Sequence, residues 1–219
     1  MGDAREKNTA LNAESIGYFD PGVAVGRLKG GNLPHWRQDG VMYFVTFRLD
    51  DSIPQTRIHL WITERDEWLA RHTPPYDNAE QEEFNEMFTQ RFMRWLDAGY
   101  GECILREPYV RAVVADTLRH FDGIRYRLGD WVIMPNHVHV LISPLGDWKL
   151  SKIVHSWKSF TALTINRILK RTGSVWQKES FDHIVRSPES HKRIVCYIRN
   201  NPKSLRSGSF SVSTSPEPS

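Results

Sequence analysis

The sequence has little cysteine and no long apolar run, and these absences exclude several classes of protein. Cys103 and Cys196 are the only cysteines among 219 residues and lie far apart, so neither a disulfide framework nor a Cys-x-x-Cys zinc site is indicated. No stretch reaches the roughly 18 consecutive apolar residues of a membrane-spanning helix. Residues 1–15 are polar and mixed in charge, unlike a secretion signal. We therefore expect a cytoplasmic protein without a membrane partner.

The net charge is only +3, but the charges are distributed unevenly along the chain. Residues 64–107 contain 11 acidic and 5 basic side chains, whereas residues 151–206 contain 12 basic and 3 acidic ones. A cationic segment of this kind can neutralise phosphates and gain free energy from the release of counterions. A solvated cationic surface without any partner would show the same excess. The charge pattern therefore permits nucleic-acid binding without establishing it.

The apolar pattern alternates between the two-residue period of strands and the three- to four-residue period of helices. If the helices between about residues 55 and 105 are set aside, the order is βαββαβ followed by a terminal helix. That order is typical of an α+β, ferredoxin-like fold, in which an antiparallel sheet carries helices on one face. The predicted strands are 41–49, 125–134, 137–142 and 176–186, and the predicted helices are 55–71, 79–98, 108–121, 150–171 and 187–201.

Composition divides the chain into three parts. Residues 1–32 lack periodicity and are rich in glycine, so we expect an irregular N-terminal arm. Residues 33–205 are the predicted folded domain, with a helical insertion at about 55–105 after its first strand. Residues 206–219 are rich in serine and proline, and we expect a disordered tail there.

The second helix of the insertion has a stripe of large apolar side chains at three- and four-residue spacing. This spacing is typical of a helix that packs by one face. The acidic residues of the region fall on the opposite face, and we expect them to take no part in chemistry. The stripe consists of Phe84, Met87, Phe88, Phe92, Trp95 and Leu96.

Two histidines, His137 and His139, lie one residue apart in the most apolar part of the sequence. Successive side chains of a strand point to opposite faces, so the two imidazoles share one face while Val138, Val140 and Ile142 fill the other. Two imidazoles in this arrangement can converge on one metal ion. Two polar residues on the wet side of a half-buried strand would give the same pattern.

Tyr197 and Asn201 lie four residues apart in the last predicted helix and therefore share a helical face. A tyrosine in such a helix ordinarily belongs to the core or makes a hydrogen bond at the surface. Its position alone assigns it no role in chemistry.

The histidine motif and the tyrosine motif together resemble those of a known family. Met134-Pro135-Asn136-His137-Val138-His139, followed by Tyr197-Ile198-Arg199-Asn200-Asn201-Pro202, resembles the single-tyrosine HUH transposases, in the branch of the REP-associated tyrosine transposases. The resemblance covers about residues 33 to 205. Further matches are Tyr43-Phe44-Val45-Thr46-Phe47-Arg48 on the first strand, Ser156-Trp157-Lys158-Ser159 on the basic helix, and Trp176-Gln177 with Asp182-His183 on the last strand.

The resemblance implies a nuclease and strand transferase that acts on single-stranded DNA carrying a hairpin, such as a REP-like palindrome, through a covalent 5′-phosphotyrosine. Tyr197 would be the nucleophile, and His137 and His139 would bind a divalent metal, with Asn201 as the third ligand. Neither ATP nor a nucleotide cofactor would be needed. A domesticated hairpin-DNA binder without catalytic activity is the alternative, and a metal hydrolase that activates water would need no tyrosine.

The resemblance implies Mg²⁺ or Mn²⁺ as the metal. Imidazole ligands favour transition metals over Mg²⁺, while phosphate oxygens and water suit both ions, so the residues fit Mn²⁺ more easily and leave zinc open. An amide such as that of Asn201 is a weaker ligand than a carboxylate.

The excess of positive charge predicts residues that contact DNA phosphates. Five of them form a ridge on the basic helix, and three lie near the predicted site. The ridge consists of Lys152, Lys158, Arg167, Lys170 and Arg171, and the other three are Arg48, Arg186 and Arg193. The sequence leaves open whether the protein is a monomer or a homodimer. A protein that acts on DNA in this way would be associated with the bacterial nucleoid.

Overall fold

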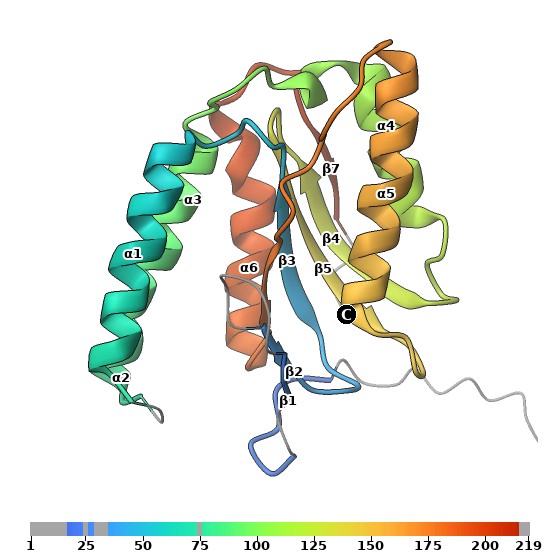
Figure 1. Ribbon diagram of the computed structural model, residues 1–219. Coiled ribbons are helices and arrows are strands. Elements are labelled where there is room, and N and C mark those ends of the chain that lie inside the picture. The colour runs from blue at the N-terminus through green and yellow to red at the C-terminus, as the bar shows by residue number, and fades with distance from the viewer. Residues whose placement is uncertain (1–16, 24–25, 29–34, 74–75, 215–219) are drawn as a thin grey trace, which may run out of the picture.

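A five-stranded antiparallel sheet forms the centre of the computed structural model, which describes residues 17–23, 26–28, 35–73 and 76–214 (Figure 1). Its strand order is β6-β3-β5-β4-β7. Without β7 this is the order of a ferredoxin-like sheet, and the predicted fold class is confirmed. The strands are β3 (Tyr43–Arg48), β4 (Tyr126–Ile133), β5 (His137–Pro144), β6 (Phe181–Ile184) and β7 (Ser211–Ser213).

The predicted helices are present, with one helix of the insertion divided into three segments. A π-helix, η1 (Asn85–Gln90), separates α2 (Asn78–Phe84) from α3 (Arg91–Asp97) where the sequence predicts a single α-helix. The other helices are α1 (Gln55–Arg71), α4 (Pro108–Arg119), α5 (Leu150–Ile168) and α6 (Pro188–Asn200), with short 3-10 turns η2 (Ile104–Arg106) and η3 (Asn201–Ser204). None of the described helices is long and apolar enough to cross a membrane.

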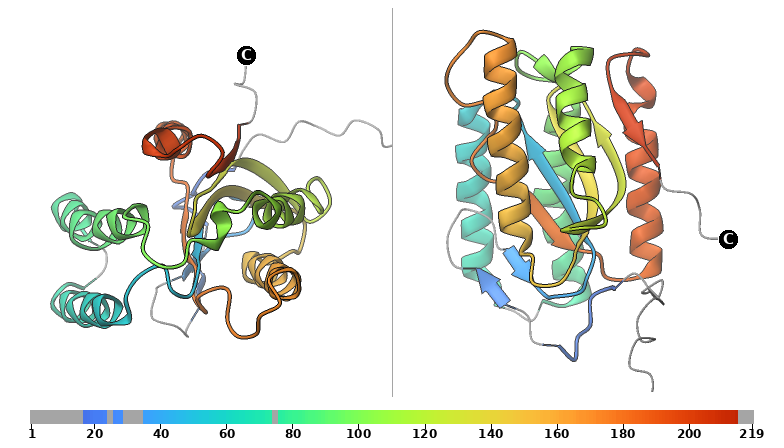
Figure 2. Two further views of the ribbon diagram at one scale, coloured as in Figure 1. Left: turned by 90° about the horizontal axis from the view of Figure 1, so that it is seen from above. Right: turned by 90° about the vertical axis from the view of Figure 1, so that its right-hand side faces the viewer.

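The two faces of the sheet are covered by different helices, as Figures 1 and 2 show. On one face, Val138, Val140 and Ile142 are fully buried in the main core, which they share with apolar residues of α4 and α5. On the other face, Leu141 and Phe44 belong to a smaller core that includes Ile198 of α6. The prediction of helices on one face therefore holds for α4 and α5, whereas α6 covers the opposite face.

The helical insertion has an apolar core of its own. Trp61 and Trp68 of α1 are buried against Phe88 and Leu96, so the apolar stripe is used for packing, except at Met87, which is exposed. Met93 of α3 packs against both this core and the smaller core under α6. The insertion is thereby joined to the face of the sheet that carries the histidines.

The prediction of a disordered tail from residue 206 is wrong for residues 211–213. They form β7, which pairs with the edge of β4 because Ile133 lies opposite Ser211 and Trp131 lies opposite Ser213. The buried Arg111 of α4 anchors this segment through hydrogen bonds to Ser211 Oγ (3.2 Å) and the Gly208 carbonyl (2.5 Å). An unpaired sheet edge and a buried guanidinium both gain hydrogen-bond partners from the tail.

The expected irregular arm also contains regular structure among its described residues. β1 (Gly26–Leu28) pairs with β2 (His35–Arg37) in a small antiparallel sheet. Arg37 then donates two hydrogen bonds to the carboxylate of Asp182 in β6, at 2.5 and 3.1 Å. The segment before residue 33 is thus attached to the central sheet. The other residues of the predicted arm, 1–16, 24–25 and 29–32, lie outside the described ranges.

Candidate metal and nucleophile site

His137 and His139 lie at the start of β5, on the face of the sheet that α6 covers. Both side chains have no exposed surface, and their Nε2 atoms lie 3.0 Å apart. The hypothesis that they occupy a wet surface is therefore wrong. Burial lowers the pKa of His137 to about 3 and the pKa of His139 well below its ordinary value, so both imidazoles are neutral at pH 7.

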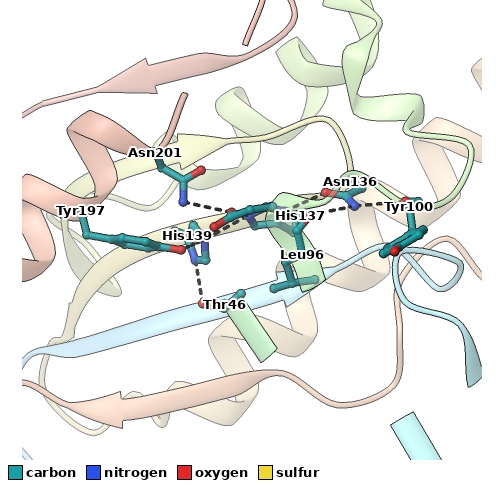
Figure 3. Close-up of polar contacts among 9 residues, drawn as sticks. Thr46, Leu96, Tyr100, Asn136, His137, His139, Tyr197 and Asn201 are labelled. Carbon is teal, nitrogen blue, oxygen red and sulfur yellow. Dashed lines mark hydrogen bonds and ion pairs between the residues drawn. The ribbon is translucent and has the colours of Figure 1, made fainter. Parts of the chain in front are cut away.

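Asn136 fixes which nitrogen of His137 carries the proton (Figure 3). The buried Asn136 amide nitrogen donates to the backbone carbonyls of Leu96 (3.2 Å) and Tyr100 (3.0 Å), which sets the orientation of the amide. Its oxygen therefore faces His137 Nδ1, at 2.7 Å. Because an amide oxygen only accepts, Nδ1 carries the proton and Nε2 presents its lone pair toward His139.

His139 is oriented in a similar way by the neighbouring strand. Its Nδ1 lies 2.7 Å from the hydroxyl of Thr46, its partner on β3, and its ring stacks on Phe44 at 5.4 Å between centroids. With Nδ1 occupied by the hydroxyl, Nε2 is directed at His137 and at α6. The two histidines thus present converging nitrogens with a fixed outer set of hydrogen bonds, which is the arrangement of imidazole metal ligands.

Tyr197 extends from α6, the helix that covers this face of the sheet, toward the Nε2 atoms of the two histidines. Its hydroxyl lies 3.2 Å from His139 Nε2 (Figure 3). Its ring packs edge-on against Phe44. Burial raises the pKa of Tyr197, and the negative charge of Asp97 raises it further. The phenol is therefore fully protonated at pH 7 and needs positive charge nearby before its oxygen can act as a nucleophile.

Asp97, the last residue of α3, belongs to the site, although the sequence predicted no chemistry for the acidic insertion. Its carboxylate oxygen lies 3.8 Å from His137 Nε2. Among the described residues, Asp97, His137 and His139 form a group of potential metal ligands whose atoms all lie within 4.8 Å of one another. Burial raises the pKa of Asp97, and a hydrogen bond from Asn201 opposes that shift.

Asn201 follows α6 at the start of η3 and lies at the rim of the same site. Its amide nitrogen donates to Asp97 Oδ1 at 3.3 Å (Figure 3 shows its position). Its amide oxygen is buried and has no hydrogen-bond partner among the residues that the structure describes. The structure therefore brings together the four residues predicted for chemistry, His137, His139, Tyr197 and Asn201, and adds Asp97.

The predicted ridge of basic residues lies on the other side of the sheet. Lys152 and Arg167 are exposed on α5, which packs against the face opposite the histidines. Lys170 is exposed just beyond α5, and Arg171 pairs with Glu102 at 2.8 Å. These residues are therefore separated from Tyr197 by the thickness of the sheet.

Lys158 and Arg48 make intramolecular contacts. The Lys158 ammonium donates to the carbonyls of Gln177 (2.6 Å) and Lys178 (2.7 Å), which ties α5 to the segment before β6. Burial lowers the pKa of Lys158 to about 8. Arg48 is buried, donates to Ser52 Oγ at 3.1 Å and lines a cavity of about 230 Å³. Arg186, which follows β6, and Arg193, on α6, are exposed.

A family model matches the part of the chain that holds both histidines and Tyr197. Residues 107–201 match the family described as IS200-like transposases. The chain is also 29% identical over 97 residues to an uncharacterized protein of Haemophilus influenzae, a match that covers 35% of this chain and 54% of the relative. The chain thus spans about half the length of that curated relative.

Among solved structures, the chain is similar to a REP-associated tyrosine transposase bound to a REP hairpin. The two chains are 16% identical with a TM-score of 0.41, and the similarity covers 78% of this chain and 73% of that chain. The family match is the stronger finding, because it covers the segment that holds His137, His139, Tyr197 and Asn201. The predicted resemblance to transposases is thus supported over residues 107–201, less than half of the chain, which are similar to IS200-like transposases.

Proposed function

We propose that the protein is a metal-dependent nuclease and strand transferase that acts on single-stranded, hairpin-forming DNA through a covalent 5′-phosphotyrosine. The observation that carries this proposal is the position of the Tyr197 hydroxyl, 3.2 Å from Nε2 of one of two buried, neutral histidines. One hydrogen-bond partner would satisfy a tyrosine that served packing alone, whereas here the partner nitrogen also faces a second imidazole nitrogen at 3.0 Å. The family match over residues 107–201 supports a transposase of this kind.

His137 and His139 would hold a divalent ion through their Nε2 atoms. The donor set fits, because both rings are neutral and each Nδ1 already has a partner, Asn136 or Thr46. The ion, Mg²⁺ or Mn²⁺, would polarise the scissile phosphate and supply the positive charge that the site lacks. The protein's part is to keep the two nitrogens converged and the tyrosine beside them.

Tyr197 would attack the scissile phosphorus. Its Oη–P bond forms while the bond from phosphorus to the 3′ oxygen breaks, and the proton lost by the phenol is balanced by the proton gained at the 3′ hydroxyl. The 5′ phosphate stays on the tyrosine, so the free energy of the ester bond is retained. A second 3′ hydroxyl can then reverse the step on a new strand without ATP.

The DNA partner would be a REP-like palindrome with single-stranded flanks, which suits a protein of the cytoplasm and the nucleoid. Arg186, which follows β6, and Arg193, on α6, are exposed and would contact the strand near the site. The ridge on α5 would contact a part of the hairpin far from the scissile phosphate. Cationic contacts of both kinds strengthen binding through counterion release.

The experiment is to incubate the protein with labelled hairpin oligonucleotides and Mn²⁺ or Mg²⁺, and to look for a covalent protein–DNA adduct. We expect an adduct for the native protein and none for Tyr197→Phe. Tyr109→Phe is the matched control, because Tyr109 is exposed on α4, across the sheet from the site, and its removal should leave the adduct unchanged.

Two results would contradict the proposal. Cleavage without an adduct that persists in Tyr197→Phe would show that water is the nucleophile. Tight hairpin binding without cleavage under any of these conditions would favour the alternative, a non-catalytic hairpin-DNA binder.

A further inference from the structure

The C-terminal end of α3, in the helical insertion, packs directly on the histidines. The carbonyls of Leu96 and Tyr100 accept both hydrogen bonds from the Asn136 amide nitrogen. Asp97 lies between these two residues, with its carboxylate 3.8 Å from His137 Nε2. The same turn therefore orients the His137 imidazole at its Nδ1 atom, through Asn136, and places a carboxylate near its Nε2 atom.

The distances among the three side chains suit one shared ion. Ligands that each lie about 2 Å from a metal ion can be at most about 4 Å apart. The His137–His139 and His137–Asp97 separations, 3.0 and 3.8 Å, meet this limit. All three ligand atoms lie within 4.8 Å of one another, so a small movement of the Asp97 side chain would bring the remaining separation, between Asp97 and His139, to the same limit. The Asp97 side chain is 40% exposed, which leaves it free to adjust and leaves the site open on that side.

Asn201 is arranged to hold this carboxylate. Its amide nitrogen donates to Asp97 Oδ1 at 3.3 Å, and the helix that carries Tyr197 ends at Asn200, immediately before it. An amide that already donates to a carboxylate positions that carboxylate, whereas its own oxygen is the weaker ligand for a divalent ion.

We propose that Asp97, from the helical insertion, is the third protein ligand of the metal site, and that Asn201 is a positioning residue for its carboxylate. This inference rests on the proposed function, because it concerns the metal that the histidines would hold. It assigns a role to the insertion, which supplies a ligand and the backbone carbonyls behind Asn136. It also differs from the ligand set implied by the family resemblance, in which Asn201 would bind the metal.

A carboxylate changes the chemistry of the site. With two neutral imidazoles as ligands, the ion and its ligands together carry two positive charges. One carboxylate ligand lowers this net charge to one positive charge, which can still attract a phosphate. An oxygen ligand also makes the site more suitable for Mn²⁺ and Mg²⁺ than imidazoles alone.

The test is a titration of the full-length protein with Mn²⁺, followed by the electron paramagnetic resonance signal of the free ion, without DNA. We expect Asp97→Asn, which keeps the shape of the side chain, to weaken Mn²⁺ binding by at least about 10-fold, the lower limit for loss of a group that supports a metal ligand. Asp116→Asn is the matched control, because that carboxylate is 80% exposed on α4, and its change should leave binding unaltered.

A double variant separates loss of the ligand from damage to the fold. Asp97→Asn combined with Asn201→Asp moves the carboxylate from α3 to the end of α6, and we expect it to recover part of the lost Mn²⁺ affinity. Asn201→Ala alone should weaken binding less than Asp97→Asn. Unchanged binding in Asp97→Asn together with strong loss in Asn201→Ala would overturn the inference and make Asn201 the ligand.

The same measurements distinguish this inference from the proposed function. If Mn²⁺ binding depends on Asp97 but no covalent adduct forms, the ligand assignment stands and the function fails. If the native protein forms the Tyr197 adduct while Asp97→Asn binds Mn²⁺ normally, the function stands and the ligand assignment fails.

Discussion

Successive residues of β5 are buried on both faces of the sheet, but their neighbours are apolar on one face and polar on the other. Val138, Val140 and Ile142 lie in a continuous apolar core with α4 and α5. His137 and His139 lie among a threonine, an asparagine, an aspartate and a tyrosine, contributed by four other segments of the chain. One face is built for stability and the other for chemistry, so substitutions on the two faces should affect different measurements.

The largest effect is expected from His139→Ala on the chemical face. Removing the imidazole takes away the nitrogen that faces both His137 and the Tyr197 hydroxyl. We expect adduct formation to fall to background and Mn²⁺ binding to be lost, while the circular dichroism spectrum keeps its native form. Formation of an adduct at the native rate would remove His139 from the mechanism.

On the opposite face, Ile142→Ala should act on stability alone. Ile142 is fully buried, and truncating such a side chain typically costs about 2–5 kcal/mol. We expect urea unfolding to show this loss, and the rate of adduct formation at a temperature where the variant is folded to be unchanged. Ile124→Ala is the matched control, because Ile124 is 67% exposed. A changed adduct rate in folded Ile142→Ala would mean that the two faces are not independent.

The sequence pattern was sufficient to predict which residues of β5 share a face, because that property is local, whereas the family resemblance was needed to connect Tyr197 with the histidines. The alternation along β5 and the spacing of Tyr197 and Asn201 are properties of single elements, and the order of elements gave the sheet. Asp97 could not be found in this way. It lies 40 positions before His137 in a helix whose pattern indicates packing, and only the tertiary contact of Leu96 and Tyr100 with Asn136 brings it to the site.

The C-terminal tail was also mispredicted because its contacts are with distant parts of the chain. Serine and proline content predicts disorder, but it does not register the unpaired edge of β4 or the buried Arg111 that binds residues 208 and 211. The N-terminal arm was misjudged for a similar reason, because the ion pair between Arg37 and Asp182 joins residues far apart in the sequence. The composition of a segment indicates whether it can form regular structure by itself. It does not indicate whether other elements of the fold will supply its hydrogen-bond partners.

A smaller effect is expected from Asn136→Ala, which removes support behind the metal ligands without removing a ligand. His137 Nδ1 would lose its acceptor, and α3 would lose its hydrogen bonds to the turn before β5. Loss of such a supporting group weakens metal binding on the order of 10–100-fold. Asn200→Ala, at an exposed position on α6, is the control for the Mn²⁺ titration. Native affinity in Asn136→Ala would show that the orientation of His137 is set elsewhere.

The smallest effect concerns the path of the DNA over the protein. It is tested by removing positive charges from each of the two faces of the sheet in turn. If the strand near the scissile phosphate follows the face of Tyr197, Arg186→Ala with Arg193→Ala should reduce the dependence of hairpin affinity on salt. Each lost contact with a single-stranded phosphate lowers the slope of log affinity against log salt by about 0.7. Lys152→Ala with Arg167→Ala removes two exposed charges from α5, across the sheet, and changes the net charge by the same amount.

We expect the first pair to lower both the slope and the rate of adduct formation, and the second pair to lower the slope alone, because α5 can contact only a part of the hairpin far from the site. Equal loss of adduct rate in the two pairs would show that the effect comes from net charge, and would remove the distinction between the two faces in DNA binding.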